Sequence, residues 1–301
     1  MRILTVGVGL KGGEISSLLH RKGAKVNRAK LFRCYAILNR LEDVKKVKID
    51  EENKFFLPRS LDVTGVFNEI LSRYEIYEGA MIVTSFKNED VKVAVEVCKK
   101  LKGVFEDPII VLGVLNTNDL SGEVREKMKA LKEFSDYMIL TREERVDETV
   151  EALNVLARVG EIDLKRRLAG EVVVDTSDLF NALSREGFTI LGHAKRNVPL
   201  FKFFMKRSQL LALRTQRMID LVRSAVENTS FEGDVETAKS ALIVFSGNPE
   251  EITMDGLFAS IRLVESLNES MVVRYGDYPI PNSRFVSAVV LFSGIRRVKF
   301  D

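Results

Sequence analysis

The first half of the sequence alternates short, apolar, β-branched runs with segments of helical periodicity. The apolar runs lie at residues 2–8, 31–38, 80–85, 108–115 and 137–141. Helical patterns lie between them at residues 15–23, 65–74, 91–101 and 124–134. Strands that are apolar along their whole length are typical of a parallel sheet covered by helices on both faces. This half of the chain therefore predicts an α/β, Rossmann-like domain.

A longer helical pattern follows the last of these strands. Val146, Val150, Leu153 and Ala157 recur at i, i+4, i+7 and i+11, which places them on one helix face. Beyond it, strand candidates lie at residues 187–194, 240–247, 269–277 and 284–295, with helical stretches at 211–227 and 254–267. We predict a Rossmann-like domain at 1–141, a central helix at 142–159 and a smaller α+β domain at 160–301.

Composition excludes several classes of protein. Of the 301 residues, 46% are hydrophobic and 30% are charged, which is ordinary for a globular chain with a full core. The net charge of +3 does not indicate a nucleic-acid partner, and no apolar run reaches the roughly 18 residues of a membrane span. Cys34, Cys98, His20 and His193 lack metal-ligand spacing. We expect a cytoplasmic protein with reduced thiols and without a metal site, a transmembrane segment or a clear nucleic-acid site.

Glycines cluster where the first strand meets the first helix. The segment TVGVGLKGGEI contains Gly7, Gly9, Gly12 and Gly13. Backbone N–H groups in such a segment can approach phosphates at a helix N-terminus, and Lys11 could face them. Gly7, Gly9 and Gly12 fit G-x-G-x-x-G, but the next strand ends at Leu38-Asn39-Arg40 without the ribose-binding acid of a dinucleotide site. A tight turn without a ligand, with Lys11 solvated, fits the segment equally well.

A second segment, GEVVVDTSD at residues 170–178, precedes the C-terminal strands. Asp175 and Asp178 are three residues apart, between a strand-like run and a helical pattern. Taken alone, this spacing is typical of a helix N-cap followed by an acid in the first turn.

The same segment resembles the loop before the C-terminal domain of the FtsZ/tubulin superfamily, whose pattern is G-x-x-N-x-D-x-x-D. Gly170, Asp175 and Asp178 match it, while Val173 replaces the asparagine. The segment VGVGLKGGEI resembles the first glycine loop of the family. Three later segments of this chain resemble C-terminal segments of the family: EGFTILGHA, GDVETAKSALIVFSGNPEEITMDGL and IPNSRFVSAVVLFSGI. Because order and spacing agree over nearly the whole chain, the sequence is identified as a divergent FtsZ/tubulin-like protein. The resemblance implies a Rossmann-like domain, a long central helix and an α+β domain.

The motifs by which this family holds guanine nucleotide are altered. In place of the GGGTGTG loop stands FKNEDVKVAVEV, in which Phe86 and Lys87 cannot let the backbone wrap phosphates as glycine does. The NTDxxxL motif keeps only Asn39, and Glu143 stands near the position of the base-recognising asparagine. The resemblance thus implies GTP or GDP, with Mg²⁺, as a ligand whose binding is weakened, altered or lost. The implied contacts are Gly7, Gly9, Lys11, Gly12, Gly13, Asn39 and Glu143.

In this family GTP is hydrolysed between subunits, and the acidic loop of one subunit polarises water on the nucleotide of the next. Asp175 and Asp178 are therefore the implied catalytic residues, because carboxylates accept protons and hydrogen bonds. The implied role is a cytoskeletal or cell-division-type subunit or regulator that associates with itself or with another FtsZ/tubulin-like protein. Two alternatives stay open: an active GTPase, and a Rossmann-type dinucleotide enzyme that uses Gly7, Gly9 and Gly12.

A basic and aromatic stretch, HAKRNVPLFKFFMKR, occupies residues 193–207. It could contact a membrane surface, a nucleic acid or a partner protein. Alternatively, Phe201, Phe204 and Met205 pack into the domain while the basic side chains stay solvated.

Overall fold

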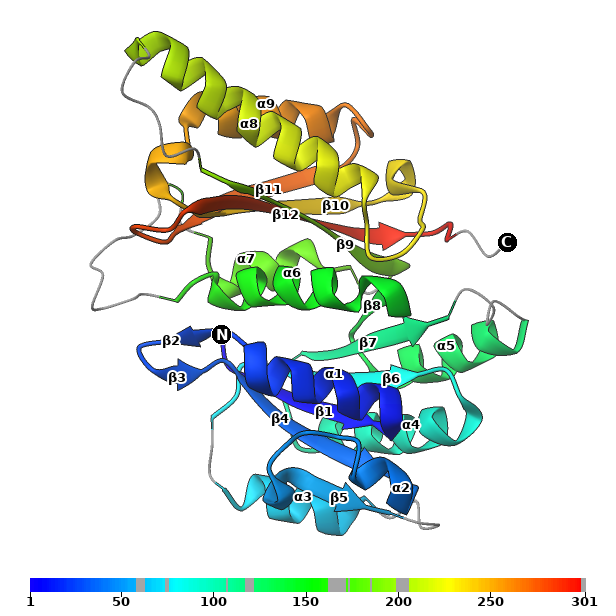
Figure 1. Cartoon of the computed structure of the whole chain (residues 1–301). Coiled ribbons are helices and arrows are strands. Elements are labelled where there is room, and N and C mark those ends of the chain that lie inside the picture. Colours follow the sequence, from blue (N-terminus) through cyan, green and yellow to red (C-terminus); the bar gives the residue numbers. More distant parts are fainter. Residues whose placement is uncertain are drawn as a thin grey trace. The chain divides into compact units, whose positions relative to one another are not determined.

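The computed structural model describes residues 1–57, 63–73, 76–106, 108–116, 122–161, 172, 174–184, 186–198 and 206–298. The chain divides into two compact units, Met1–Val146 and Asp147–Lys299, which we call the N-terminal and the C-terminal unit. Figure 1 labels their helices and strands. Within the described residues, no helix is both long and apolar enough to cross a membrane.

The N-terminal unit is built on a parallel sheet, as predicted. Its strand order is β8-β7-β6-β1-β4-β5, and every pairing in this part of the sheet is parallel. The strands are β1 (Ile3–Val8), β4 (Phe32–Leu38), β5 (Lys54–Phe56), β6 (Ala80–Ser85), β7 (Ile109–Leu115) and β8 (Tyr137–Arg142). All residues of β1, β6 and β7 are buried, which explains why these strands read as continuous apolar runs.

Helices and a hairpin surround this sheet. The longer helices are α1 (Gly9–Lys22), α3 (Thr64–Leu71), α4 (Asn88–Lys102) and α5 (Gly122–Phe134). The short elements are β2 (Lys25–Val26), β3 (Ala29–Lys30), α2 (Leu41–Val44), η1 (Glu51–Asn53) and η2 (Glu143–Arg145). Helix α1 packs on β1, β4 and β6, and α4 packs on β6 beside α5.

Helix α1 begins at Gly9, immediately after β1, rather than near Ile15 as we predicted. The reason is close packing. A Cβ on Gly12 would lie 2.2 Å from the carbonyl oxygen of Val83 in β6, and a Cβ on Gly7 would lie 2.2 Å from the carbonyl oxygen of Gly12. Side chains at either position would push the helix off the sheet. The glycines therefore allow the helix to start at once, and no open loop separates it from β1.

The C-terminal unit contains a mixed sheet with the strand order β11-β10-β12-β9. Its strands are β9 (Phe188–Asn197), β10 (Ser240–Gly247), β11 (Val272–Pro279) and β12 (Phe285–Ile295). β12 is antiparallel to β9 and β10, whereas β10 and β11 are parallel. The helical elements are α6 (Val146–Arg158), α7 (Thr176–Ala182), α8 (Arg207–Glu227), η3 (Val235–Thr237), η4 (Pro249–Glu251) and α9 (Met254–Glu265). Figure 1 shows α8 and α9 together on one face of this sheet and α7 on the other.

Helix α6 carries the apolar stripe that the sequence indicated. Val150, Leu153 and Ala157 are buried, and Val146 is half-buried. The predicted limits of the three parts, 1–141, 142–159 and 160–301, stay a prediction.

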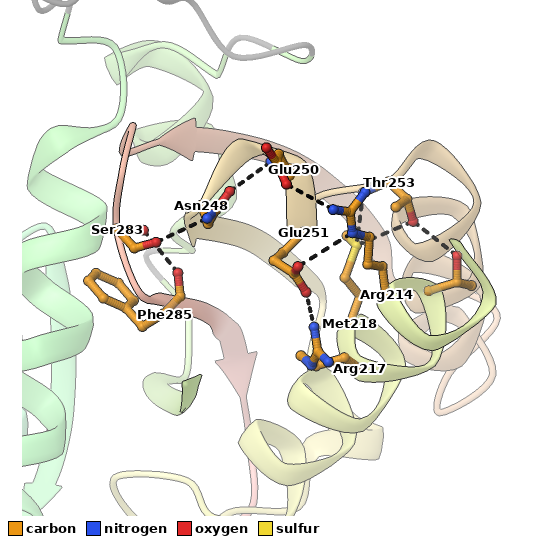
Figure 2. A network of polar contacts seen from close by, with 10 residues as sticks. Arg214, Arg217, Met218, Asn248, Glu250, Glu251, Thr253, Ser283 and Phe285 are labelled. Atoms are coloured by element: carbon orange, nitrogen blue, oxygen red, sulfur yellow. Dashed lines mark hydrogen bonds and ion pairs between the residues drawn. The ribbon is translucent and has the colours of Figure 1, made fainter. Parts of the chain in front are cut away.

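A polar network fastens α8 to η4 and to the start of α9 (Figure 2). The carboxylate of Glu251 is fully buried and forms ion pairs with Arg217 and with Nε of Arg214, the latter at 3.4 Å. Arg214 also reaches the exposed Glu250 at 2.9 Å. The N–H of Thr253, which caps α9, donates to Sδ of Met218 at 3.1 Å. Two arginines from one helix thus neutralise a buried acid on the neighbouring segment.

We expect Gly12→Ala to lower the free energy of unfolding by about 1–3 kcal/mol, because the added methyl group overlaps the Val83 carbonyl. Urea denaturation followed by circular dichroism measures the change. Gly65→Ala in α3 is the matched control, since a Cβ there meets no atom within 4 Å. It should be neutral or stabilise the protein by about 0.5 kcal/mol. Equal effects at the two positions would contradict the packing explanation.

We expect Glu251→Ala to destabilise the protein by about 3 kcal/mol, because it leaves two arginines without their buried counter-ion. Glu250→Ala removes an exposed carboxylate that pairs with the same Arg214 and should cost less than about 1 kcal/mol. Thermal melts of both variants make the comparison. A small loss at Glu251 would show that the buried pair contributes little to holding α8.

Candidate functional site

Residues predicted to hold a nucleotide lie at one edge of the N-terminal unit's sheet. Gly9 follows β1, Asn39 follows β4 and Glu143 follows β8. These strands belong to one parallel sheet, so their carboxyl ends share an edge, which we call the carboxyl edge. Ligands of open α/β sheets bind outside this edge. The candidates from the sequence therefore lie at the edge where such sheets bind ligands, and their contact with a nucleotide stays a prediction.

Packing accounts for three of the four predicted glycines. Gly7 and Gly12 allow α1 to touch β1 and β6, as described above, and a Cβ on Gly13 would lie 2.8 Å from a methyl group of Val47. Contact between these glycines and a nucleotide stays a prediction. Gly9 differs from the other three, because it begins the helix with a φ of +70°, in the left-handed region that favours glycine.

A buried carboxylate lies against Gly9. A Cβ at position 9 would come within 2.3 Å of the carboxyl carbon of Asp90, a residue in the first turn of α4 that is only 7% exposed. The hydroxyl of Ser85 donates a hydrogen bond to Oδ2 of Asp90 at 2.8 Å. Burial raises the pKa of this carboxyl group, and the Ser85 hydrogen bond opposes part of that rise. Asp90 therefore occupies space at the N-terminus of α1, where unpartnered helix N–H groups attract anions.

The connection between β6 and α4 consists of Phe86 and Lys87. The Phe86 side chain is buried, and its ring lies over β7, where a Cβ on Gly113 would be 2.7 Å from Cζ. The Phe86 carbonyl accepts a hydrogen bond of 2.8 Å from Nζ of Lys127. This two-residue link is thus held against β7 and α5, and α4 begins directly after it without a side-chain cap.

Lys11 and Glu143, both predicted as nucleotide contacts, bind each other. Nζ of Lys11 lies 3.3 Å from the Glu143 carboxylate and 3.7 Å from that of Glu14. All three side chains are about one-third to two-fifths exposed, so the contacts are surface ion pairs worth at most about 1 kcal/mol each. Lys11 is thus committed to protein carboxylates.

A pocket of about 370 Å³ opens at the carboxyl edge beside Asn39 and Asp90. Nδ2 of Asn39 donates to the Glu89 carboxylate at 3.4 Å. Acidic side chains outnumber basic ones in the lining, which includes Glu42, Asp43, Glu89 and Asp90 against Arg40, Lys46 and Lys87. Such a lining is poorly matched to a triphosphate.

Sequence reasoning missed Asp90 and Ser85. From its neighbours in the sequence, Asp90 is an ordinary acid in the first turn of a helix. Its contact with Gly9, 81 positions away, is what makes it a candidate site residue. The aspartate in the FKNED segment, which replaces the glycine loop, is the one signal in the sequence for this contact.

The acidic loop forms a helix cap in the C-terminal unit. Oδ1 of Asp175 accepts a hydrogen bond from the Asp178 N–H at 2.8 Å, and Oδ2 of Asp178 accepts one from the Asp175 N–H at 3.3 Å. This capping box begins α7, so the helix-cap interpretation of the sequence is confirmed. Among the described residues, the second oxygen of each carboxylate makes no hydrogen bond. Gly170 and Val173 lie outside the described residues.

The basic and aromatic stretch is only partly described. His193 to Asn197 complete β9, whereas Phe201, Phe204 and Met205 lie outside the described residues. Nε2 of His193 is 3.9 Å from the Glu151 carboxylate, and burial lowers the pKa of the imidazole.

The two cysteines are buried free thiols. Burial raises the pKa of Cys34 and of Cys98 to about 12, so both stay protonated near neutral pH. In the part of the chain that the structure describes, no group of three or more histidine, cysteine or acidic side chains could hold a metal ion.

Comparison with known proteins identifies the family. A family model described as "Tubulin-like CetZ, C-terminal domain" matches residues 142–300. Tubulin-like protein CetZ1 of Haloferax volcanii is 28% identical over 235 residues, which cover 66% of this chain and 59% of CetZ1. The chain thus spans less than two thirds of this curated relative.

Solved structures share the fold. The GDP-bound monomer of CetZ1 from Haloferax volcanii has a TM-score of 0.82 at 22% identity, and the match covers 100% of this chain and 96% of that one. The GTPγS-bound protofilament of CetZ2 from the same organism has a TM-score of 0.76 at 22% identity, with 99% and 95% covered. The predicted fold, a Rossmann-like domain followed by a smaller α+β domain, is confirmed.

The family match extends over more than half of the sequence and agrees with the fold of both units. The resemblance to the FtsZ/tubulin superfamily is confirmed, and the chain belongs to the tubulin-like CetZ family.

Proposed function

We propose that this chain is a tubulin-like cytoskeletal or cell-division-type subunit, or a regulator of such subunits, whose guanine-nucleotide binding is weakened or lost. Membership of the CetZ family supports the subunit role, because a CetZ2 relative is described as a GTPγS-bound protofilament. The observation that carries the altered nucleotide binding is the buried carboxylate of Asp90 against Gly9.

Electrostatics explains why this carboxylate opposes nucleotide. The N-terminus of α1 has no side-chain cap and no acid in its own first turn, so its N–H groups are suited to an external anion. Asp90 brings a negative group to that position from α4. A phosphate placed there would meet a like charge in a poorly solvated site, where repulsion is stronger than in water.

The neighbouring connection supports the same conclusion. GGGTGTG in the superfamily is replaced by the fixed link Phe86–Lys87, and Lys11 is paired with Glu143 and Glu14. In this proposal the binding edge lacks the glycine-rich cradle of the superfamily, and Lys11 faces two protein carboxylates that compete with a phosphate for it. GTP or GDP, with Mg²⁺, would bind here weakly or not at all.

We assign the acidic loop a role toward a neighbouring subunit. Asp175 and Asp178 each use one carboxylate oxygen in the capping box, which leaves the other oxygen for water or Mg²⁺. In a protofilament, these oxygens would position water on nucleotide held by the next subunit, either a second copy or another tubulin-like protein. The chain would then contribute an acidic face to an assembly even without its own nucleotide.

We expect Asp90→Asn to become more stabilising, or less destabilising, relative to the wild type as pH rises from about 4 to about 7. The folded protein raises the pKa of Asp90, so it holds the proton more tightly than the unfolded chain. Stability from this group is full below the unfolded pKa and is lost as pH rises through the folded pKa. The asparagine side chain does not ionise, so the Asp90→Asn variant does not lose this stability as pH rises. Urea titrations across the pH range measure it, with the exposed Glu89→Gln as control; a pH-independent difference would contradict the burial argument.

We expect the purified, nucleotide-free chain to show no guanine-selective binding of GTP or GDP with Mg²⁺ tighter than about 1 mM, or about −4 kcal/mol, in calorimetric titrations that use ATP as the comparison. Asp90→Asn should bind GTP at least about tenfold more tightly, because the like charge is gone. Micromolar, guanine-selective binding by the wild type would instead favour the active GTPase. In that case GTP turnover should rise steeply with protein concentration and vanish in Asp178→Ala.

A further inference from the structure

A basic pocket lies at the other edge of the N-terminal unit's sheet, where the parallel strands begin. The pocket encloses about 540 Å³ and is lined by Arg2, Arg28, Lys30, Arg33, Ile76 and Tyr77, together with Ala29. Arg2 immediately precedes β1, and Arg33 is the second residue of the parallel neighbour β4. The pocket is therefore at the opposite ends of the strands from Gly9, Asn39 and Glu143.

The local sequence is unusually basic. Between Ile15 and Leu41 the chain has seven lysines and arginines and neither aspartate nor glutamate, although the whole chain carries a net charge of only +3. Most of these basic residues lie at the end of α1, in the β2–β3 hairpin and in β4. Among the described lining residues of the pocket, none is acidic.

Several of these charges have no acidic partner. In the part of the chain that the structure describes, the guanidinium groups of Arg2 and Arg28 form no ion pair. Nζ of Lys30 lies 3.3 Å from Nε2 of His20, which is not an anion. The nearby Glu78 is engaged with the Met1 ammonium group at 3.8 Å and with the Arg2 backbone N–H at 2.7 Å. The pocket thus keeps excess positive charge.

Arg28 occupies a position where the backbone favours glycine. Asn27 and Arg28 form the two-residue turn between β2 and β3, with φ values of +49° and +70°. Turns with both central residues at positive φ favour Asn-Gly, because arginine is strained in the left-handed region. The turn therefore carries an arginine at a conformational cost, and that arginine lines the pocket.

The lining indicates the chemistry of the ligand. Guanidinium groups bind phosphate oxygens through paired N–H donors, and three of them beside an ammonium group suit an anion with several linked phosphates. The volume lies within the range of small-molecule sites. Tyr77 is buried and Ile76 is 79% exposed, so an apolar wall stands beside the charges and suits an organic group attached to the phosphates.

We propose that the pocket formed by Arg2, Arg28, Lys30 and Arg33 binds a small molecule or headgroup that carries two or more linked phosphates. Two kinds of ligand carry such phosphates: a soluble polyphosphate compound and a polyphosphorylated lipid headgroup. This site is separate from the carboxyl edge and does not depend on the proposed loss of nucleotide binding there.

The test uses the full chain and sodium tripolyphosphate in calorimetric titrations at low salt. The wild type should bind one tripolyphosphate saturably, and the affinity should fall as NaCl rises from about 50 to about 300 mM. Arg28→Gly should weaken binding at least tenfold. The same substitution places the favoured residue in the turn, so the melting temperature should stay equal or rise.

Matched controls keep the test specific. Lys92→Ala removes one exposed positive charge from α4 and should leave binding unchanged. Sulfate at the same concentration should bind far more weakly than tripolyphosphate. Absence of saturable tripolyphosphate binding by the wild type would overturn the proposal. So would equal binding by the wild type and Arg28→Gly, or equal binding of sulfate and tripolyphosphate.

Further experiments identify the kind of ligand and distinguish binding at this pocket from binding at the carboxyl edge. Sedimentation with vesicles that contain a bisphosphorylated inositol lipid, displaced by tripolyphosphate, would assign a lipid headgroup; a lack of vesicle binding would assign a soluble compound. GTP bound at this pocket would be matched by ATP and tripolyphosphate and lost in Arg28→Gly. GTP bound at the carboxyl edge would be guanine-selective and unchanged in Arg28→Gly.

Discussion

The contact between helix α1 and strand β6 sets the geometry of the N-terminal unit. Gly12 brings the helix against the Val83 carbonyl, and Gly7 allows the same turn to touch β1. With this approach fixed, the helix has to begin at Gly9, directly at the end of β1. At the carboxyl edge the N-terminus of α1 follows β1 directly, and the N-terminus of α4 follows β6 after two residues. The carboxylate of Asp90, in the first turn of α4, lies against Gly9 at the start of α1.

The two edges of this sheet consequently differ in charge. At the carboxyl edge, Asp90 and its acidic neighbours outnumber the basic side chains of the pocket, and Lys11 is neutralised by Glu14 and Glu143. At the opposite edge, arginines and a lysine line a pocket without a described acid. Because charged pockets concentrate ligands of opposite sign, the unit is better suited to take a polyanion where its strands begin than where they end.

Sequence patterns predicted what local interactions determine. AMIVTS coincides with β6 because a strand buried on both faces is mostly apolar, and the Asp175–Asp178 cap followed from a spacing of three residues. The start of α1 was wrong because it depends on a contact between Gly12 and Val83, 71 positions apart. Arg28, Lys30 and Arg33 of the basic pocket lie within six residues of sequence, so their gathering is largely local. The contact of Asp90 with Gly9 is non-local, as is that of Gly12 with Val83. No window of sequence contains both partners of these contacts.

The two sets of aspartates differ as evidence of function. Asp175 and Asp178 satisfy backbone N–H groups of α7, so a helix of this kind would keep them with or without hydrolysis. Asp90 is different, because burial raises the pKa of its carboxyl group despite the hydrogen bond from Ser85. A buried acid with a perturbed pKa is a candidate for a functional role. At the N-terminus of α1, the role that we propose for it is the exclusion of a competing anion.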